Sequence, residues 1–359
     1  MSAYEYLLDV RGLRTCFFTQ GGVIKAVDDV SFRIAEGEVL GLAGESGCGK
    51  SVTCLSLMRL VTPPGRIVGG EVVFKGRDLL GLAEKEVQAL RGSQIGMVFQ
   101  EPASALNPVF TIGYQVAESV MIHKGASRKE GLKEAVRMLE EVAIPDPARR
   151  AGEYPHQLSG GMRQRVMIAM ALICAPSLLI ADEPTTALDV TIQAQILDLM
   201  LRLREKYRLS ILLVTHDLGV MAEMADRVAV MYAGKIVELA SVRDLFKAPL
   251  HPYTAGLMNS IPGVAGGGRS AGGERRRLHA IEGVVPDLLH LPGGCSFNPR
   301  CPDVMPECHE ASPALLPPAP GPGASSATGA RQVACFKYKP VAEAPSPVDG
   351  RGWDPVKGR

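Results

Sequence analysis

The stretch Gly44-Glu45-Ser46-Gly47-Cys48-Gly49-Lys50-Ser51 decides the fold class. It fits the pattern G-x-x-x-x-G-K-[S/T] of a phosphate-binding loop. Such a loop follows a strand and opens a helix, and here the apolar run Val39–Ala43 precedes it and a helical pattern over 52–60 follows it. Glycines let the backbone wrap around a phosphate without Cβ clashes, and free N–H groups at the helix start hold the anion. The sequence therefore predicts a strand, a nucleotide-binding loop and a helix.

The loop also predicts roles for individual side chains. We expect Lys50 to reach the β- and γ-phosphates and Ser51 to bind Mg²⁺. Cys48 fills a variable position, so we interpret it as part of the loop without a catalytic role. A chance glycine-rich turn is disfavoured because every fixed position matches. The expected nucleotide contacts in this stretch are Gly44, Ser46, Gly47, Cys48, Gly49, Lys50, Ser51 and Val52.

Two carboxylates follow a second apolar run. Leu178-Leu179-Ile180-Ala181 leads directly into Asp182 and Glu183, as when a buried strand delivers acids to the edge of a sheet. By itself such a pair is often the start of a solvated loop. Together with the phosphate-binding loop, it predicts that Asp182 holds Mg²⁺. Glu183 is then the general base that polarises the attacking water, worth about 10²–10⁴-fold in rate.

Two further apolar runs end in polar side chains. His216 follows the run 211–215, and Gln100 follows the run 95–99. Either residue alone would be an ordinary polar group at a strand end. Because the carboxyl ends of parallel strands face one edge of the sheet, we interpret His216 as a γ-phosphate contact that also orients the water.

Length and composition limit the class of protein. The chain has 359 residues, 46% of them hydrophobic, which suggests two domains at about 150 residues each. Lys and Arg total 39 and Asp and Glu total 38, a formal net charge of +1. This balance excludes the broad basic face of a general nucleic-acid binder. We see no run of about 20 apolar residues and no secretory signal, so we expect a cytoplasmic protein that reaches a membrane only through partners.

Most of the chain is predicted to form one α/β unit, over residues 6–262. Short apolar runs alternate with helical segments, which favours a largely parallel sheet covered by helices. The first part differs, because 6–18 and 23–34 have the pattern of two strands joined at Gly21-Gly22. We expect these strands to form an antiparallel flap.

A glycine-rich break separates this unit from a smaller one. Residues 263–273 have the composition of a flexible linker. A second module is expected over 274–340, interrupted by a Pro-, Ala-, Gly- and Ser-rich loop at 313–330. Residues 341–359 are predicted to be a disordered tail.

The second module contains four of the eight cysteines of the chain. Their spacing is wider than the C-x₂-C pairs of structural zinc sites and the tight runs of bacterial ferredoxins. Disulfides are not expected in the cytoplasm. Four thiolates suit either a [4Fe–4S] cluster or Zn²⁺, and free thiols are the third alternative. The cysteines concerned are Cys295, Cys301, Cys308 and Cys335.

A second anion-binding helix start is predicted at Leu158-Ser159-Gly160-Gly161-Met162-Arg163-Gln164-Arg165. Ser159 can cap a helix, and the two glycines leave bare N–H groups at its beginning. One chain does not need two such starts for one nucleotide. We therefore expect this one to serve the nucleotide of a partner chain.

At this point the sequence resembles the ABC ATPases, whose signature is LSGGQ; Met162 replaces the usual Gln. The resemblance implies an ABC-type P-loop NTPase fold: a RecA-like core, an antiparallel β flap and a helical subdomain at about 101–157. It makes Gln100 the glutamine that senses the γ-phosphate and ligates Mg²⁺, and 187–189 the D-loop. Phe18, in preference to Phe17, becomes the aromatic residue that stacks on adenine.

In this family two ATPase subunits dimerise head to tail, and each ATP lies between one phosphate loop and the signature of the other chain. The resemblance thus implies ATP and Mg²⁺ as cofactors. Lys50, Glu183 and His216 would be the catalytic residues. The residues implied to contact the partner's nucleotide are Ser159, Gly160, Gly161 and Gln164.

Several stretches are similar to the D-type ATP-binding subunit of dipeptide/oligopeptide permeases, and the module after the linker resembles the C-terminal extension of that group. The resemblance implies peptide import with an F-type ATPase subunit, two membrane subunits and an extracytoplasmic binding protein, at the cytoplasmic face of the inner membrane. It also implies a [4Fe–4S] cluster on the four cysteines. The stretches are 100–108, 154–157, 162–170, 189–195, 251–254 and 278–339.

Other functions stay open at this point. Importers of nickel, glycans or opines share these ATPases. Non-transport ABC ATPases usually carry two cassettes or a long coiled coil, and neither is seen here. A scaffold with a dead site is disfavoured by the intact Lys50, Asp182, Glu183 and His216.

Overall fold

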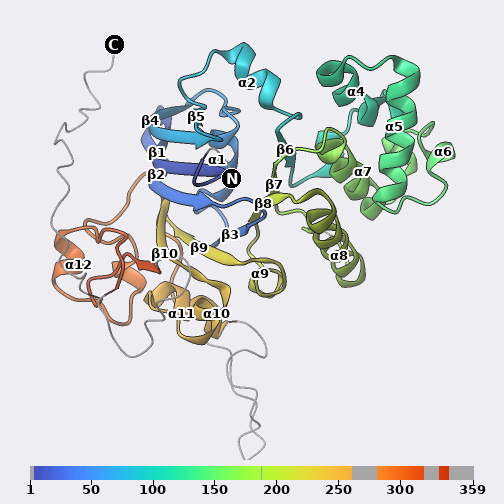
Figure 1. Ribbon diagram of the computed structural model, residues 1–359. Helices are drawn as coiled ribbons and strands as arrows, with labels where there is room; N and C mark the ends of the chain where they lie inside the picture. Colours follow the sequence, from blue (N-terminus) through green and yellow to red (C-terminus); the bar gives the residue numbers. More distant parts are fainter. Residues whose placement is uncertain (1–3, 187, 261–280, 319–330, 339–359) are drawn as a thin grey trace, which may run out of the picture.

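The computed structural model describes residues 4–186, 188–260, 281–318 and 331–338 (Figure 1). The predicted linker 263–273 and the predicted tail 341–359 lie outside these residues. So do 274–280, 319–330 and 339–340 of the predicted C-terminal module, and position 187 of the predicted D-loop.

The core of the molecule is a seven-stranded sheet in the order β11-β10-β9-β3-β8-β7-β6. Pairing is parallel from β9 to β6, and only β10 and β11 run antiparallel to their neighbours. The prediction of a largely parallel sheet is thus confirmed. The strands are β3 (Val39–Ala43), β6 (Ile95–Val98), β7 (Leu178–Asp182), β8 (Ser210–Val214), β9 (Arg227–Tyr232), β10 (Lys235–Ser241) and β11 (Gln332–Val333).

A second, antiparallel sheet has the order β2-β1-β4-β5 and packs beside the first (Figure 1). Its first two strands form the hairpin that the sequence predicts as a flap. β1 also pairs along its length with β4. The strands are β1 (Leu8–Thr19), β2 (Gly22–Ile34), β4 (Gly65–Phe74) and β5 (Arg77–Asp78).

Most of the helices between β6 and β7 form a separate group to one side of the sheets (Figure 1). The range 101–157, predicted as a helical subdomain, contains α3 to α6 and a short 3₁₀ turn. α7 starts after it and leads back to β7. The elements are α3 (Pro102–Ala105), α4 (Ile112–Lys124), α5 (Arg128–Glu141), α6 (Pro147–Arg150), η1 (Pro155–Gln157) and α7 (Gly160–Leu172).

The remaining helices connect strands or belong to the C-terminal part. None of the helices in the described ranges combines the length and apolar character needed to cross a membrane. These elements are α1 (Lys50–Leu57), α2 (Glu84–Leu90), α8 (Val190–Tyr207), α9 (Leu218–Met224), α10 (Val242–Lys247), α11 (Pro252–Asn259), η2 (Asn298–Arg300) and α12 (Glu307–Glu310).

Alternate residues of the buried strands serve two different cores. Leu179 and Leu213 join the apolar cluster shared with the helical group. Ile180 and Leu212 join the cluster shared with the antiparallel sheet and α1. Successive side chains of a strand point to opposite faces, so a sheet covered on both faces has continuous apolar strands. This is why the strands are uninterrupted apolar runs in the sequence.

The C-terminal module packs on the edge of the core rather than standing apart. β11 adds to β10. Phe297 is 2% exposed, and its ring centroid lies 5.2 Å from that of Tyr232 and 5.4 Å from that of Tyr253. This aromatic cluster joins the module to β9 and α11.

Candidate functional site

The phosphate loop needs its glycines for steric reasons. Gly44 has φ +153° and Gly49 has φ +107°. A Cβ on Gly44 would lie 2.2 Å from the carbonyl oxygen of Met231, and one on Gly49 would lie 2.1 Å from that of Ala26. The loop therefore packs closely against β9 and β2. Any other side chain at either position would displace the backbone.

Lys50 points back into the loop. The residue is 5% exposed, and its Nζ donates to the carbonyl oxygens of Gly44 at 2.8 Å and Glu45 at 2.9 Å. The ammonium group therefore lies inside the ring of loop backbone where the sequence predicts phosphates.

The structure brings together two of the three predicted Mg²⁺ ligands, Ser51 and Asp182, which are 131 positions apart: Ser51 Oγ donates to Asp182 Oδ1 at 3.1 Å. The third, Gln100, donates to Glu183 instead. Burial raises the pKa of Asp182, the Ser51 hydrogen bond opposes this rise, and the charge of Glu183 adds to it. Proteins usually supply only a few oxygen ligands to Mg²⁺, such as one carboxylate and a hydroxyl. Phosphate oxygens of the substrate and water supply the others. The residues present therefore fit this ion.

Three side chains contact the carboxylate of Glu183, one from its own loop and two from other segments of the chain. Gln100 Nε2 donates to its Oε2 at 3.1 Å, and Thr186 Oγ1 donates to the same oxygen at 2.8 Å. His216 Nδ1 lies 3.3 Å from Oε1. The carboxylate is thus fixed at the carboxyl edge of the sheet, between the ends of β6 and β8.

Two of the three side chains around Glu183 were predicted from the sequence, and one was not. Gln100 and His216 were expected to share one site, and the structure places both against the same carboxylate. Thr186 was missed, because nothing in the local pattern distinguishes it from Thr185. His216 is 60% exposed at its side chain, whereas Glu183 is 12% exposed. Within this group of side chains, the histidine therefore lies on the side that faces solvent.

The signature segment begins α7 on the surface of the helical group. Ser159 caps the helix by accepting a hydrogen bond from the Met162 N–H at 3.4 Å. Ser159 and Gly160 are exposed, while a Cβ on Gly161 would lie 2.8 Å from Ile192 Cγ2. The glycine at 161 therefore permits close packing of α7 on α8.

Gln164 differs from its predicted role as a nucleotide contact. It is 2% exposed, and its Nε2 is buried without a hydrogen-bond partner in the described part of the chain. The residue lies five positions past the capping Ser159, on the buried face of α7. Sequence spacing alone could not show which face that would be.

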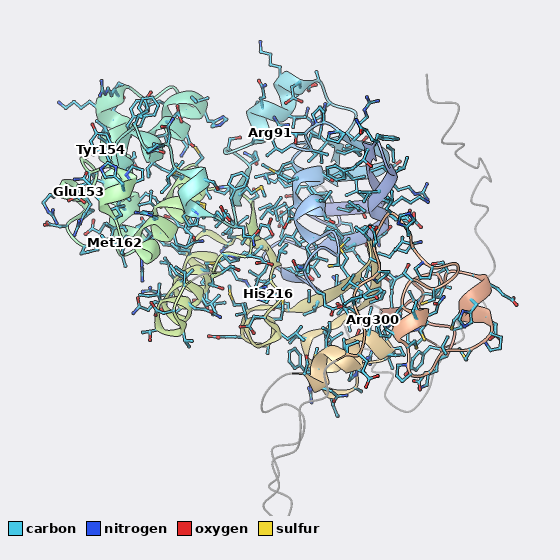
Figure 2. The ribbon with its side chains drawn as sticks, turned by 180° about the vertical axis from the view of Figure 1, so that it is seen from behind. Arg91, Glu153, Tyr154, Met162, His216 and Arg300 are labelled. Atoms are coloured by element: carbon cyan, nitrogen blue, oxygen red, sulfur yellow. The ribbon has the colours of Figure 1, made fainter. Side chains whose placement is uncertain are left out.

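The signature does not reach the phosphate loop of its own chain. In Figure 2, Met162 in the helical group lies well apart from His216 at the sheet edge. The two anion-binding helix starts therefore do not converge on one nucleotide within this chain.

The two candidate aromatic residues for adenine lie near the end of β1. Phe18 is 37% exposed, and the Arg66 guanidinium lies 5.7 Å from its ring centroid. Phe17 is half-buried and faces Gly65, where a Cβ would lie 2.7 Å from its ring. Phe18 therefore presents the more accessible ring.

The four cysteines of the C-terminal module are free thiols. Burial raises the pKa values of Cys295, Cys301 and Cys335, and charges on the other thiols add to each rise. Within the described ranges, however, no group of three or more His, Cys, Asp or Glu side chains is placed to hold a metal ion. The structure thus gives no support to the predicted iron–sulfur cluster, which stays a prediction.

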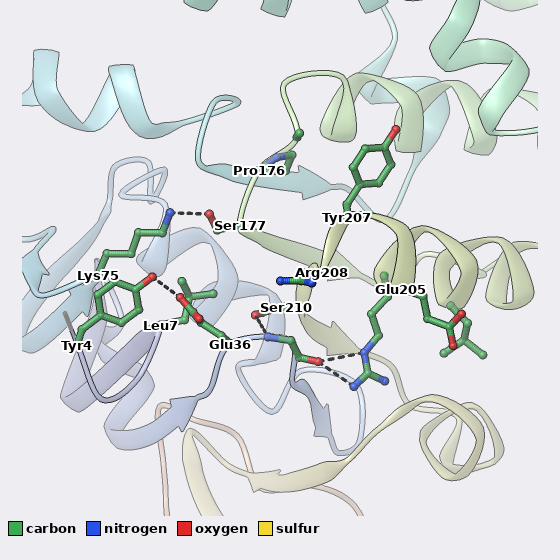
Figure 3. A pocket seen from close by; sticks show the side chains of 14 residues that line it. Tyr4, Leu7, Glu36, Lys75, Pro176, Ser177, Glu205, Tyr207, Arg208 and Ser210 are labelled. Atoms are coloured by element: carbon green, nitrogen blue, oxygen red, sulfur yellow. Dashed lines mark hydrogen bonds between the residues drawn. The ribbon is translucent and has the colours of Figure 1, made fainter. Parts of the chain in front are cut away.

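A separate cavity of about 760 Å³ lies at the opposite, amino-terminal edge of the sheet (Figure 3). Ser177 and Ser210, at the starts of β7 and β8, line it together with Lys75 and Arg204. Lys75 Nζ donates to Ser177 Oγ at 2.6 Å, and Arg204 Nη2 donates to the carbonyl oxygen of Gly37 at 2.8 Å. These polar groups bind one another, and nucleotides bind at the carboxyl edge of such sheets. The cavity is thus not part of the nucleotide site.

The fold, together with the phosphate loop and the side chains at the carboxyl edge of the sheet, defines an ATPase of the ABC transporter class. The family model for ABC transporters matches residues 27–186. The chain is also similar to a dimeric ATP-binding cassette in a post-hydrolysis state bound to ADP and Pi, with 30% identity and a TM-score of 0.60, over 66% of this chain and 99% of that one.

Within this class, the chain belongs to the oligopeptide/dipeptide D-type family of ABC transporter ATP-binding proteins. The model for the oligopeptide/dipeptide transporter C-terminal region matches residues 237–308. The dipeptide transport ATP-binding protein of Bacillus subtilis is 50% identical, over 86% of this chain and 90% of its own. The oligopeptide transport ATP-binding protein of Salmonella typhimurium is 49% identical, over 94% and 95% respectively. The chain is thus an ABC ATPase subunit that powers transport, and such a subunit works with permease and partner ATPase subunits.

Proposed function

We propose that this chain binds and hydrolyses MgATP to drive the import of dipeptides or oligopeptides. The observation that carries the proposal is the convergence of Gln100 and His216 on the carboxylate of Glu183, directly beside the Ser51–Asp182 pair. This arrangement places a base, a metal site and a phosphate loop at one edge of the sheet. It matches the requirements of phosphoryl transfer to water.

Each group then has a defined task. Lys50 balances the charge of the β- and γ-phosphates from within the loop. Ser51 and Asp182 hold Mg²⁺, with Gln100 joining them when the γ-phosphate is present. Glu183 takes the proton of the attacking water, and His216 orients that water against the γ-phosphate. The ring of Phe18 stacks on adenine.

A second cassette completes the site. The start of α7 carries the exposed Ser159 and Gly160, whose N–H and hydroxyl groups would bind the γ-phosphate held by the partner. The similar ADP-bound cassette is dimeric, which supports the pairing of two cassettes. We propose an F-type subunit as the partner; a second copy of this chain is the alternative.

The assembly would lie at the cytoplasmic face of the inner membrane, beneath two membrane subunits that an extracytoplasmic binding protein supplies with peptide. Residues from Gln100 to about 122 are the proposed contact with the membrane subunits. They connect the γ-phosphate sensor to the helical group, and Val109 and Ile122 are 70% and 69% exposed. Exposed apolar side chains in this segment suit a protein interface.

Substrate class is tested by reconstituting the chain with its partner subunits in proteoliposomes. ATP-dependent uptake is measured for labelled dipeptides, oligopeptides, nickel and glycans, with Lys50→Ala as the inactive control. Uptake of peptides alone supports the proposal. Uptake of nickel or a glycan in place of peptides would replace it with the related importer.

The iron–sulfur cluster is a separate proposal that rests on the donor set. Cys295, Cys301, Cys308 and Cys335 are four free thiols of one small module, but in the described ranges no three of them are placed to hold a metal ion. Iron, zinc and acid-labile sulfide are measured on anaerobically purified protein. About four irons and four sulfides per chain would support the cluster. Zinc alone or no metal would contradict it.

A further inference from the structure

An arginine of the C-terminal module reaches the phosphate loop. Arg300 Nη1 donates to Glu45 Oε2 at 2.8 Å, and its Nη2 donates to Glu45 Oε1 at 3.1 Å. The two residues are 255 positions apart. Glu45 fills the first variable position of the loop, directly after Gly44. This bidentate ion pair is thus a direct contact between the module and the nucleotide site.

The guanidinium of Arg300 has further contacts in its own module and on β9 of the core. Its Nε donates to the carbonyl oxygen of Glu282 at 3.0 Å, and its carbon lies 5.9 Å from the ring centroid of Tyr232. The side chain of Arg300 is 4% exposed, whereas that of Glu45 is 29% exposed. The arginine is therefore the more deeply buried partner of the pair.

Glu45 is also fixed through its backbone. Its N–H donates to the Tyr253 hydroxyl at 2.9 Å, and its carbonyl oxygen accepts from Lys50 Nζ at 2.9 Å. Tyr253 is fully buried and packs against Phe297 of the module. The same short segment of the loop therefore contacts the module through both side chain and backbone.

The charge of Glu45 presents a problem for a loop that binds a polyanion. An unpaired carboxylate beside the phosphates of ATP would repel them, and the repulsion is strong where water is partly excluded. Arg300 neutralises this carboxylate and turns it toward the module. Arginine suits the task because its planar fork matches both carboxylate oxygens.

We propose that Arg300 is a positioning residue for ATP binding, and that the C-terminal module sets the affinity of the phosphate loop for nucleotide through the Arg300–Glu45 pair. The inference rests on the proposed role of this loop in binding ATP. It predicts that the module affects nucleotide affinity more than the rate of the chemical step.

The test is ATP binding and hydrolysis by the full chain and its assembled transporter. Removal of one partner of a buried pair leaves the other charge uncompensated. Arg300→Ala is therefore expected to weaken ATP binding and raise the KM by about tenfold, with little change in kcat. Glu45→Gln removes the repulsive charge and is expected to lose much less ATP affinity than Arg300→Ala. The double variant should recover most of the lost affinity.

A second ion pair between the module and the core provides the matched control. Arg331 Nη2 donates to Glu238 Oε1 at 2.8 Å, on β10 and away from the phosphate loop. Arg331→Ala therefore also loosens the module, and thermal unfolding measures the loss for both variants. Only Arg300→Ala should raise the KM, and only its defect should be reversed by Glu45→Gln.

Wild-type affinity in Arg300→Ala would overturn the inference. The inference would also be overturned if Arg300→Ala and Arg331→Ala had equal KM values and Glu45→Gln did not restore affinity. That result would show that the C-terminal module had merely loosened from the core. Should Arg300→Ala not fold, Arg300→Lys replaces it, and a wild-type KM there contradicts bidentate positioning. A wild-type chain that binds no ATP would instead overturn the proposed role of the loop.

Discussion

Two helices of this chain begin at glycine-rich segments, but their surroundings differ. The start of α1 is enclosed by its own chain: Gly49 adopts φ +107° without a side-chain cap, and Lys50 is buried beneath the loop. The start of α7 is capped by Ser159 and open to solvent. The enclosed N-terminus of α1, with its lysine and the predicted Mg²⁺ ligands beside it, can bind a nucleotide of its own chain. The exposed N-terminus of α7 can contact only a nucleotide that another chain brings to it.

Under the proposed function, this difference means that one chain carries only part of a complete nucleotide site. Asp182, Glu183 and the phosphate loop all lie at one edge of the sheet. The signature lies on a separate helical group. Dimerisation is the step that would join them, so the two helix starts should respond differently to substitution.

The largest effect is expected from Glu183→Gln, which keeps the shape of the side chain but removes the base. Turnover in the assembled transporter should fall by about 10²–10⁴-fold, while ATP binding persists and the ATP-bound dimer accumulates. Phosphate release and size-exclusion chromatography measure both properties. Glu223→Gln, an exposed change on α9, is the control. Near-wild-type turnover in Glu183→Gln would remove this residue as the base.

Lys50→Ala tests the enclosed helix start. Hydrogen bonds to charged groups contribute about 1.5–3 kcal/mol, so ATP affinity should fall by about 10- to 100-fold. The measurement is binding of a fluorescent ATP analogue. Lys129→Ala, on the exposed surface of α5, should bind normally. An unchanged affinity in Lys50→Ala would contradict the assigned phosphate contact.

Ser159→Ala tests the exposed N-terminus of α7, and Ser127→Ala at the N-terminus of α5 is the matched control. Ser127 caps α5 in the same way, by accepting from the Glu130 N–H. Both substitutions should cost about 1 kcal/mol of stability. Only Ser159→Ala should reduce ATP-dependent dimerisation, by about tenfold if one charge-assisted hydrogen bond is lost, and neither should change ATP binding to the single subunit. Equal dimerisation of the two variants would show that Ser159 acts only as a cap.

The smallest effect is expected at the adenine end. Phe18→Ala should weaken ATP binding by about fivefold, the lower end for base–aromatic stacking, because the ring is 37% exposed. Phe17→Ala should mainly lower stability, since that ring packs on Gly65. Isothermal titration and thermal unfolding separate the two effects. A larger loss of affinity in Phe17→Ala would move the adenine contact to that residue.

The sequence by itself determined which strands and loops carry the predicted nucleotide contacts. These patterns are local: the glycine spacing of a phosphate loop and an apolar run that ends in acids each involve residues that are close in the sequence. They can therefore be recognised without the tertiary structure. For this reason Lys50, Ser51, Asp182 and Glu183 could be assigned to one edge of a parallel sheet. The antiparallel flap followed from two strand patterns joined at a glycine turn.

The tertiary structure decided which side chains meet. The strand order β3-β8-β7-β6 brings Gln100 and His216 to Glu183, and packing of α7 turns Gln164 inward. No local pattern indicates that Arg300 would pair with Glu45, because the contact depends on how the C-terminal module docks. Periodicity is a property of neighbouring residues, whereas ion pairs between distant segments depend on the packing of the whole chain.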